Sequence, residues 1–310
     1  MRLAPLFSAL FAAATPALAE PLKVQVQDLT VEYEVFFAPM IPGEVLDLQV
    51  MGRPSENEIR FDAPDRGEAL EGEMKLAWKA PDEPGHYPLT ITDETTGDRF
   101  TLNVLVGYPK SDIEDGALNG YKIGQYEEQP LRGQDTYLPP EGFIEVSEET
   151  KDVQVSPHFR LGQFICKQET DAEARYVVLR PELLLKLEQA VDLIQDEGFD
   201  VGTLYVMSGY RTPWYNKAIG NTTSYSRHLY GDAADVFVDI RPKNGVMDDL
   251  NGDGTVDKAD ANHLYDAVER MASANTEVSI KGGIGSYAAN AAHGPFVHID
   301  TRGTPARWGR

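Results

Sequence analysis

Hydrophobic and polar residues alternate along the first part of the chain. Between residues 22 and 107, apolar side chains recur at every second position, which is the period of a strand with one buried face. Turn signals rich in proline and glycine separate the alternating runs. Short strands at this spacing predict an all-β domain over residues 20–107, an antiparallel sandwich of immunoglobulin-like type. The clearest runs cover residues 31–37, 74–78, 87–91 and 100–104.

Residues 108–155 show little periodicity. Proline and glycine interrupt this stretch repeatedly, and we interpret it as a connector that is ordered in places. Its aromatic side chains predict that it packs against a neighbouring unit. These side chains are Tyr121, Tyr126, Tyr137 and Phe143.

From residue 156 to residue 310, helical and strand periods are mixed. Leucines at helical spacing, with Pro181 in the first turn, predict a helix over residues 181–198, and a second helix is expected over residues 264–271. Short apolar runs predict strands between and after them, the first of these a buried one. This mixture favours an α+β domain built on a small antiparallel sheet. The expected strands cover residues 203–207, 235–240, 282–285 and 296–300.

The first residues have the composition of a secretory signal peptide. Arg2 supplies a positive start, residues 6–14 form an apolar run, and Ala17-Leu-Ala19 is a cleavage site of the Ala-x-Ala type. The apolar run is too short to span a bilayer. The absence of a cysteine near the cleavage site argues against a lipoprotein. We therefore expect a signal peptide over residues 1–19, cleavage after Ala19 and export, with the bacterial periplasm as the expected location.

Acidic residues outnumber basic ones by 50 to 28, which gives a formal net charge of -22. Because no basic stripe is available to meet phosphates, nucleic-acid binding is disfavoured, and the acidic excess also disfavours adhesion to anionic lipid. Hydrophobic residues make up 42% of the 310 positions, which is enough for two packed domains. Cys166 is the single cysteine, so we expect a small buried apolar residue and no intramolecular disulfide.

Two short blocks in the second domain combine residue types that bind metals. Residues 226–235 read Ser-Arg-His-Leu-Tyr-Gly-Asp-Ala-Ala-Asp, and residues 296–300 read Phe-Val-His-Ile-Asp. Two histidines and one carboxylate are the ligand set of an open zinc site, which keeps a fourth position for water. The glycine in the first block lets the chain turn back after His228, so that a return strand can bring Asp235 to the same metal as His228.

These blocks resemble the zinc D-Ala-D-Ala carboxypeptidases and endopeptidases of peptidase family M15, which cut bacterial cell-wall peptides and are distant structural relatives of the hedgehog signalling domain. Residues 208–212, which read Ser-Gly-Tyr-Arg-Thr, and the opening segment 156–167 carry the same resemblance. The end of the chain, with Arg307-Trp308 shortly after the second block, is most similar to the murein endopeptidase branch. The resemblance covers residues 156–310, about half of the chain.

The resemblance implies a hedgehog/DD-peptidase type of α+β fold and one catalytic Zn²⁺ held by His228, Asp235 and His298. It also implies that Arg211 contacts the substrate or stabilises the reacting carbonyl, a role that suits the planar guanidinium. An ion pair between Arg211 and a structural carboxylate is the alternative. The residues that the resemblance implies in substrate binding are Ser208, Tyr210 and Ser226.

The chain departs from the family at the general base. Family members commonly place a glutamate or histidine two or three residues before the last ligand, where this chain has Phe296 and Pro295. Asp300 is one substitute, because it lies on the same strand face as His298. His293, in a glycine-containing loop, is the other. We expect Asp300 to be the catalytic base, with His293 as the alternative, and a loss of activity is the remaining interpretation.

Residues 249–260 match the calcium-binding loop of EF-hand proteins. Oxygen donors occupy positions 1, 3, 5, 9 and 12 of the loop, and glycine stands at position 6. Aspartate replaces the usual glutamate at position 12 and no clear helix precedes the loop, so it resembles dockerin loops. We predict one structural Ca²⁺ that braces the second domain, with a solvated acidic turn as the alternative. The predicted ligands are Asp249, Asn251, Asp253, Thr255 through its backbone carbonyl, Asp257 and Asp260.

Together these features predict an exported zinc peptidase that acts on the stem or cross-link peptides of peptidoglycan. The carboxypeptidase and endopeptidase activities both stay open, and the end of the chain slightly favours the endopeptidase. The first domain clusters no catalytic residue types and is expected to be a spacer or a wall-binding module. The competing hypothesis is a non-catalytic module that binds cell wall or protein on an inactive zinc-peptidase fold.

Overall fold

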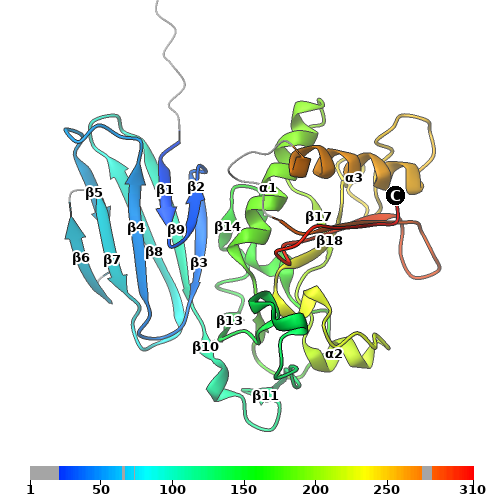
Figure 1. The fold of residues 1–310 in the computed structure, drawn as a ribbon, viewed down its shortest axis with the longest axis horizontal. Helices are drawn as coiled ribbons and strands as arrows, with labels where there is room; N and C mark the ends of the chain where they lie inside the picture. Colours follow the sequence, from blue (N-terminus) through cyan, green and yellow to red (C-terminus); the bar gives the residue numbers. More distant parts are fainter. Residues whose placement is uncertain (1–20, 65–66, 73, 274–280) are drawn as a thin grey trace, which may run out of the picture.

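The chain folds into a strand-rich half and a mixed half of helices and strands that lie side by side (Figure 1). The computed structural model describes residues 21–64, 67–72, 74–273 and 281–310. The predicted signal peptide lies outside these residues. Among the helices that are described, none is both long and apolar enough to cross a membrane.

The strand-rich half contains two sheets. Their strands are β1 Lys23–Val26, β2 Leu29–Val31, β3 Val35–Met40, β4 Val45–Met51, β5 Ile59–Asp62, β6 Glu68–Gly72, β7 Lys75–Lys79, β8 Gly85–Asp93 and β9 Arg99–Val106. One sheet has the order β2-β1-β4-β7-β6 and the other β3-β9-β8-β5. Alternate residues such as Trp78 and Leu102 are fully buried, and each buried side chain of this kind contributes roughly 1.5–3 kcal/mol.

One strand pair departs from the antiparallel arrangement that the pattern predicts. Strand β3 pairs with β9 in parallel, with Val35 opposite Thr101, whereas the remaining pairs of both sheets are antiparallel. The alternation of side chains along a strand shows which face is buried, and the alternation is the same whether the partner strand runs parallel or antiparallel. The sequence pattern therefore does not distinguish the two directions. The assignment to the immunoglobulin-like type stays a prediction.

The connector is attached to the mixed half by strand pairing. Its elements are β10 Tyr108–Pro109, η1 Lys110–Asp112, β11 Ala117–Leu118, β12 Tyr121–Lys122, η2 Leu131–Gly133, η3 Asp135–Tyr137, β13 Gly142–Val146 and β14 Gln154–Ser156. Strand β13 pairs with β10 on one side and with β16 (Arg175–Val177) on the other. Tyr121, Tyr137 and Phe143 are buried, as expected for a segment that packs on its neighbour.

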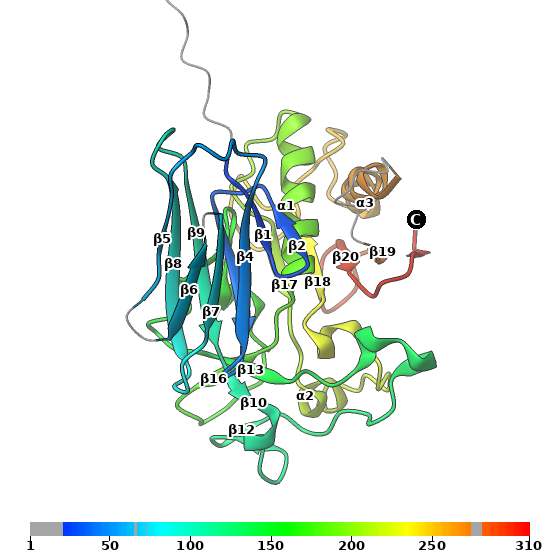
Figure 2. The ribbon, with the colours of Figure 1, turned by 60° about the vertical axis from the view of Figure 1, so that its left-hand side comes forward.

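The mixed half is built on a five-stranded sheet with the order β17-β18-β20-β19-β21. Its elements are β15 Phe159–Arg160, η4 Leu161–Phe164, β16, α1 Pro181–Asp196, β17 Tyr205–Ser208, α2 Pro213–Ala218, η5 Arg227–Tyr230, β18 Ala233–Phe237, α3 Lys258–Ser273, β19 Gly283–Tyr287, β20 Phe296–Asp300 and β21 Ala306–Trp308. The sheet is antiparallel except for the parallel pair of β19 and β21. Helices α1 and α3 contact each other and the sheet (Figure 2).

Two expectations for this half need correction. Strand β17 is not buried: it lies at the edge of the sheet and Tyr205 is 40% exposed, since the chain pairs it on one side only. Helix α3 begins at Lys258, six residues before the predicted start. The earlier start has a local cause, because Asp257 accepts from the backbone N–H of Ala259 and Asp260 accepts from that of Asp257. This arrangement resembles a capping box, with the Asp257 side chain bonded to the second N–H of the helix in place of the third.

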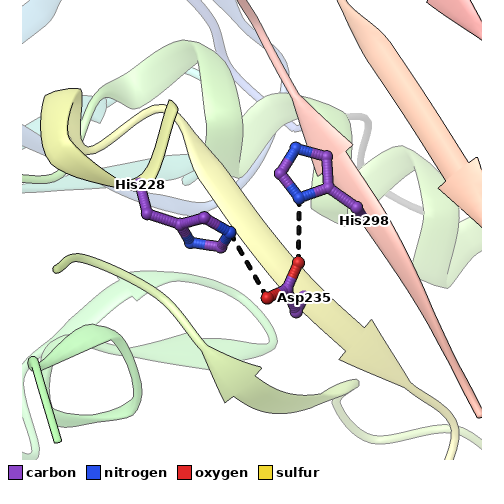
Figure 3. Close-up of side chains that lie close together, drawn as sticks. All are labelled: His228, Asp235 and His298. Atoms are coloured by element: carbon purple, nitrogen blue, oxygen red, sulfur yellow. Dashed lines mark hydrogen bonds and ion pairs between the residues drawn. The ribbon is translucent and has the colours of Figure 1, made fainter. Parts of the chain in front are cut away.

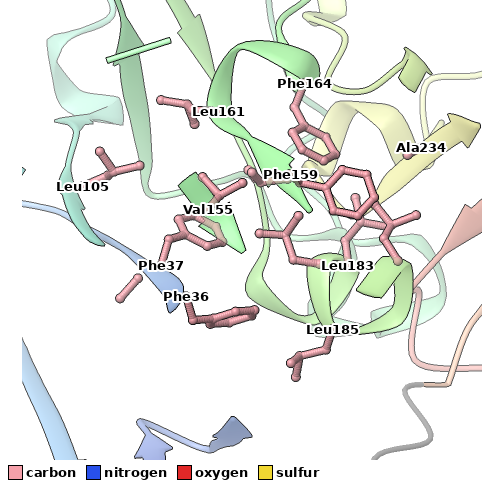
Figure 4. Packing of buried hydrophobic residues seen from close by; sticks show 14 of the residues in the cluster. Phe36, Phe37, Leu105, Val155, Phe159, Leu161, Phe164, Leu183, Leu185 and Ala234 are labelled. Carbon is pink, nitrogen blue, oxygen red and sulfur yellow. The ribbon is translucent and has the colours of Figure 1, made fainter. Parts of the chain in front are cut away.

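The two halves share one hydrophobic core. Phe36 and Phe37 of β3 belong to the same buried cluster as Val155 of β14, Phe159 of β15 and Leu183 of α1 (Figure 4). Because this packing is continuous, the strand-rich half is a fixed neighbour of the mixed half.

Polar contacts line the margin of this shared core. Tyr33 donates to Asp192 Oδ2 of α1 at 3.1 Å, and Asn103 Nδ2 donates to the carbonyl of Gln154 at 2.8 Å. Burial, followed by the charges of Asp192 and Glu188, raises the pKa of Tyr33 above its usual range, so that its hydroxyl stays a donor. These bonds tie the sandwich to α1 and to the connector.

Candidate metal centre

His228 lies on η5, a short 3-10 turn that ends at a left-handed glycine. Gly231 has φ 68°, and a Cβ at this position would collide with the carbonyl of Val178. Only glycine suits this position, because every other residue carries a Cβ and rarely adopts a positive φ. The turn that the sequence predicts after His228 is therefore present, and it directs the chain into β18.

Asp235 and His298 are direct cross-strand partners in the sheet. Asp235 of β18 pairs with His298 of β20. Side chains that lie opposite each other in antiparallel strands have Cβ atoms about 4.5–5.5 Å apart, so the pairing alone brings the carboxylate and the imidazole together. His228 reaches the same point from η5 (Figure 3).

The three side chains converge on one point. One oxygen or nitrogen atom from each of His228, Asp235 and His298 lies within 4.8 Å of the other two. His298 Nδ1 is 2.8 Å from Asp235 Oδ1, and His228 Nε2 is 3.3 Å from Asp235 Oδ2. Of the His, Cys, Asp and Glu side chains that the structure describes, these form the one such cluster. All three are buried.

The outward nitrogen of each histidine has its own partner, which fits a metal site. His228 Nδ1 is 2.7 Å from the carbonyl of Gly209, and His298 Nε2 is 3.1 Å from Asp300 Oδ2. Histidines that bind metals usually donate the second ring N–H to a carbonyl or a carboxylate, which fixes the tautomer. His228 Nε2 and His298 Nδ1 are therefore the atoms that face the centre. The donor set of two imidazoles and one carboxylate fits zinc.

The pKa values of the three side chains are shifted by burial and by their contacts with one another. Burial lowers the pKa of His228. Burial opposes ionisation of Asp235, but the two histidines outweigh it and hold the pKa of its carboxyl well below the usual range. Burial also disfavours the charged form of His298, yet its hydrogen bonds to Asp235 and Asp300 raise its pKa to about 9.

Arg211 spans two of the residues that the sequence singles out. Its Nη2 donates to Asp235 Oδ2 at 2.8 Å, and its Nε donates to Ser208 Oγ at 2.9 Å. The guanidinium therefore contacts the carboxylate of the cluster itself, and 18% of its side chain is exposed. Arg211 thus forms an ion pair, and its partner Asp235 is a member of the cluster and not a separate structural carboxylate.

Asp300 contacts His298 at Nε2, the ring nitrogen that faces away from the cluster. Its carboxylate is fully buried and accepts from the backbone N–H of Gly283 at 2.7 Å and from Arg302 Nε at 2.9 Å. With His298 Nε2 as a further partner, both oxygens are engaged. This geometry favours an orienting role for Asp300 over that of a base, because no oxygen faces solvent.

His293 lies in the loop before β20 and is half-buried. Its ring stands edge-on to Phe296, with ring centroids 4.8 Å apart, and its Nε2 is 2.7 Å from Asn290 Nδ2. Phe296 shares the strand face of His298, since the two are separated by one residue. His293 is thus placed at the edge of the face that carries the cluster.

The three residues implied in substrate binding have different environments. Ser208 accepts from Arg211, and Ser226 is half-buried just before η5. Tyr210 is only 1% exposed, and its hydroxyl is 2.8 Å from that of Tyr126. Tyr210 therefore packs the connector onto the site and presents no surface to a ligand.

Several residues that support the cluster were not anticipated from the sequence. Arg227 of η5 pairs with Asp232 inside the protein, and its guanidinium lies 4.0 Å from the ring centroid of Tyr137. The connector is thereby fastened to the turn that carries His228. Lys186 of α1 is fully buried and donates to the carbonyl of Asp300 at 2.8 Å. The sequence carries one signal for the burial of Lys186, because this residue lies at helical spacing from Leu183 and therefore on the apolar face of the helix.

The acidic loop 249–260 is held by hydrogen bonds from its own backbone. Asp249 accepts from the N–H groups of Gly252 and Gly254, and the fully buried Asp260 accepts from those of Leu250 and Asn251. The loop thus forms a closed turn at the start of α3. Calcium binding at this loop stays a prediction.

A comparison with curated proteins finds no match to the chain. A protein-family model does match: residues 157–252 fit the model described as Peptidase M15. The matched segment covers under half of the chain and includes Arg211, His228 and Asp235, while His298 follows it in the paired strand β20. This match supports the M15 peptidase family for the part of the chain that carries the first two residues of the cluster.

Proposed function

We propose that this protein is an exported zinc metallopeptidase that hydrolyses stem or cross-link peptides of peptidoglycan. The observation that carries the proposal is the buried cluster of His228, Asp235 and His298, whose ligand atoms lie within 4.8 Å of one another, in a chain with a match to Peptidase M15. The carboxypeptidase and endopeptidase activities are both compatible with this cluster.

His228 Nε2, His298 Nδ1 and the carboxylate of Asp235 would hold the zinc ion. Bound there, zinc would lower the pKa of a coordinated water and polarise the scissile carbonyl. Arg211 is held by Ser208 and Asp235, and its remaining N–H groups would bind a carbonyl or carboxylate of the peptide. The protein residues therefore divide into ligands and a substrate-orienting cation.

A groove beside η5 offers a place for a peptide. Its volume is about 610 Å³, and Leu229, the neighbour of His228, forms part of its wall. Tyr126, Trp214 and Asn216 also line it, which combines an apolar surface with side chains that form hydrogen bonds. Pockets of this size accommodate small-molecule ligands. None of the three cluster residues lines the groove, so Leu229, next to His228, is its link to the proposed zinc site.

Proton transfer requires a base, and this chain departs from the family at that position. Phe296 and Pro295 occupy the positions of the family base, and both are buried. Since the Asp300 carboxylate is fully buried behind His298 whereas the His293 ring is partly exposed in its loop, we propose His293 as the proton acceptor. The same departure from the family favours a second candidate function, a non-catalytic binding module that keeps the metal site.

A digestion of purified muropeptides tests the proposal. Wild-type protein should contain one zinc per chain and should cleave peptide bonds in the muropeptides, and chelator should abolish cleavage until zinc is restored. His228→Ala should lose both zinc and activity. His263→Ala is the matched control, because His263 pairs with Glu197 on the surface and should retain both.

Three outcomes separate the alternatives. Equal zinc content in wild type and His228→Ala would refute the ligand assignment. Zinc-loaded wild type that cleaves no muropeptide would support the binding module. Cleavage that persists in chelator would show that the activity does not depend on the cluster.

A further inference from the structure

We infer that Arg302 is a positioning residue, which holds the Asp300 carboxylate against His298 Nε2 so that His298 Nδ1 faces the metal. This inference rests on the zinc site of the proposed function and assigns a role to residues outside the ligand set. It is carried by a continuous set of contacts across strands β20, β19 and β21.

The carboxylate of Asp300 is fixed from three directions. Arg302 places Nε 2.9 Å from Oδ1 and 3.0 Å from Oδ2, and its Nη2 also contacts Oδ2. The backbone N–H of Gly283 donates to Oδ1 at 2.7 Å. His298 Nε2 then lies 3.1 Å from Oδ2. With five N–H donors in a rigid fork, arginine can hold both oxygens in a set orientation.

The backbone around Asp300 is held as well. Lys186 Nζ donates to the Asp300 carbonyl at 2.8 Å and lies 3.5 Å from the carbonyl of Gly283. A fully buried lysine is costly unless its charge is compensated. Here Lys186 joins α1 to the ends of β19 and β20, directly behind the histidine ligand.

Glycines in β19 leave the space that this arrangement needs. A Cβ on Gly283 would collide with Asp300 Oδ2, and a Cβ on Gly285 would collide with the indole of Trp308. Gly285 lies between His298 and Trp308 in the sheet, paired with each of them. The Gly-Ile-Gly run of this strand therefore reflects the close approach of two side chains from neighbouring strands.

Trp308 completes the arrangement around His298. Its ring centroid is 5.3 Å from that of His298, and the Arg302 guanidinium lies 5.4 Å from its ring. Trp308 Nε1 donates to the hydroxyl of Tyr287 at 2.8 Å. The imidazole is thus confined by Trp308 on one side and oriented by Asp300 at its outer nitrogen, so its rotation is restricted.

The test measures zinc affinity and a metal spectrum instead of activity alone. Zinc dissociation constants would be determined by competition with a chelator, and the visible absorption of the Co²⁺-substituted protein would report the ligand geometry. Arg302→Gln and Asp300→Asn should weaken zinc binding by about 10- to 100-fold and shift the Co²⁺ bands. Arg310→Gln is the matched control, since Arg310 pairs with Asp266 at the surface.

Arg302→Lys distinguishes orientation from charge. Lysine keeps the positive charge but cannot place a planar fork on both oxygens, so we expect weaker zinc binding than in the wild type. Zinc affinity and Co²⁺ spectra equal to wild type in Arg302→Lys, or in a folded Arg302→Gln, would overturn the inference. A wild-type protein that binds no zinc would instead overturn the proposed function, which keeps the two failures distinct.

Discussion

The sandwich and the sheet of the mixed half fill their interiors with different side chains. Buried positions in the sandwich are predominantly apolar, as with Phe36 and Trp78. The sheet β17-β18-β20-β19-β21 buries Asp235, His298 and Asp300 together with hydrophobic neighbours. Buried charges are expensive unless they are paired, and these are paired with one another. The interior of the sandwich therefore mainly packs, whereas the sheet of the mixed half also holds a cluster of paired charges.

Burying a charged group is unfavourable, and Lys186 in the mixed half shows this through its pKa. Burial lowers the pKa of Lys186 to about 8, although the nearby Asp300 charge opposes the shift. Asp300 shows the reverse balance: burial disfavours its charge, but His298 and Arg302 hold the pKa of its carboxyl well below the usual range. A network of this kind is stable only as a whole. Substitutions in the two regions should therefore have different consequences.

The largest effect is expected on catalysis in the mixed half. His293→Ala should lower turnover of muropeptides by about 100- to 10,000-fold if His293 is the general base, while zinc content and melting temperature stay near those of the wild type. Activity, metal analysis and thermal unfolding of one preparation measure all three. His263→Ala is the control, because it removes a histidine outside the cluster that pairs with Glu197. Unchanged turnover in His293→Ala would exclude this residue as the base.

A large effect on stability is expected in the shared core. Phe36→Ala should destabilise the protein by about 3–5 kcal/mol, because it leaves a cavity where the sandwich meets α1. Zinc per folded chain should not change. Since the core is continuous, calorimetry should show one unfolding transition for both halves. Two separate transitions in the wild type would show that the halves unfold independently.

The smallest effect is expected at the acidic loop. If residues 249–260 bind calcium only in the folded state, a calcium concentration about ten times the dissociation constant should add about 1.4 kcal/mol to stability. Asp249→Ala combined with Asp253→Ala should abolish this gain and leave zinc content intact. A calcium-induced stabilisation that survives the double substitution would place the site elsewhere. No stabilisation in the wild type would favour the solvated acidic turn.

The sequence by itself determined the elements with strong local signals. Helix α1 begins at Pro181 as the proline and leucine spacing predict, and β20 covers residues 296–300 as predicted. The turn after His228 follows from Gly231. These features depend on neighbouring residues in the chain, and the spacing of apolar and special residues records them directly.

Tertiary structure alone decided which residues act together. Asp235 and His298 are 63 residues apart, and strand register brings them into contact. The parallel pairing of β3 with β9, the exposed edge of β17 and the burial of Asp300 behind His298 are likewise set by partners distant in sequence. A one-dimensional pattern reports the period and the buried face of each element, but it does not report the strand that lies beside it or the guanidinium that reaches a carboxylate across the sheet.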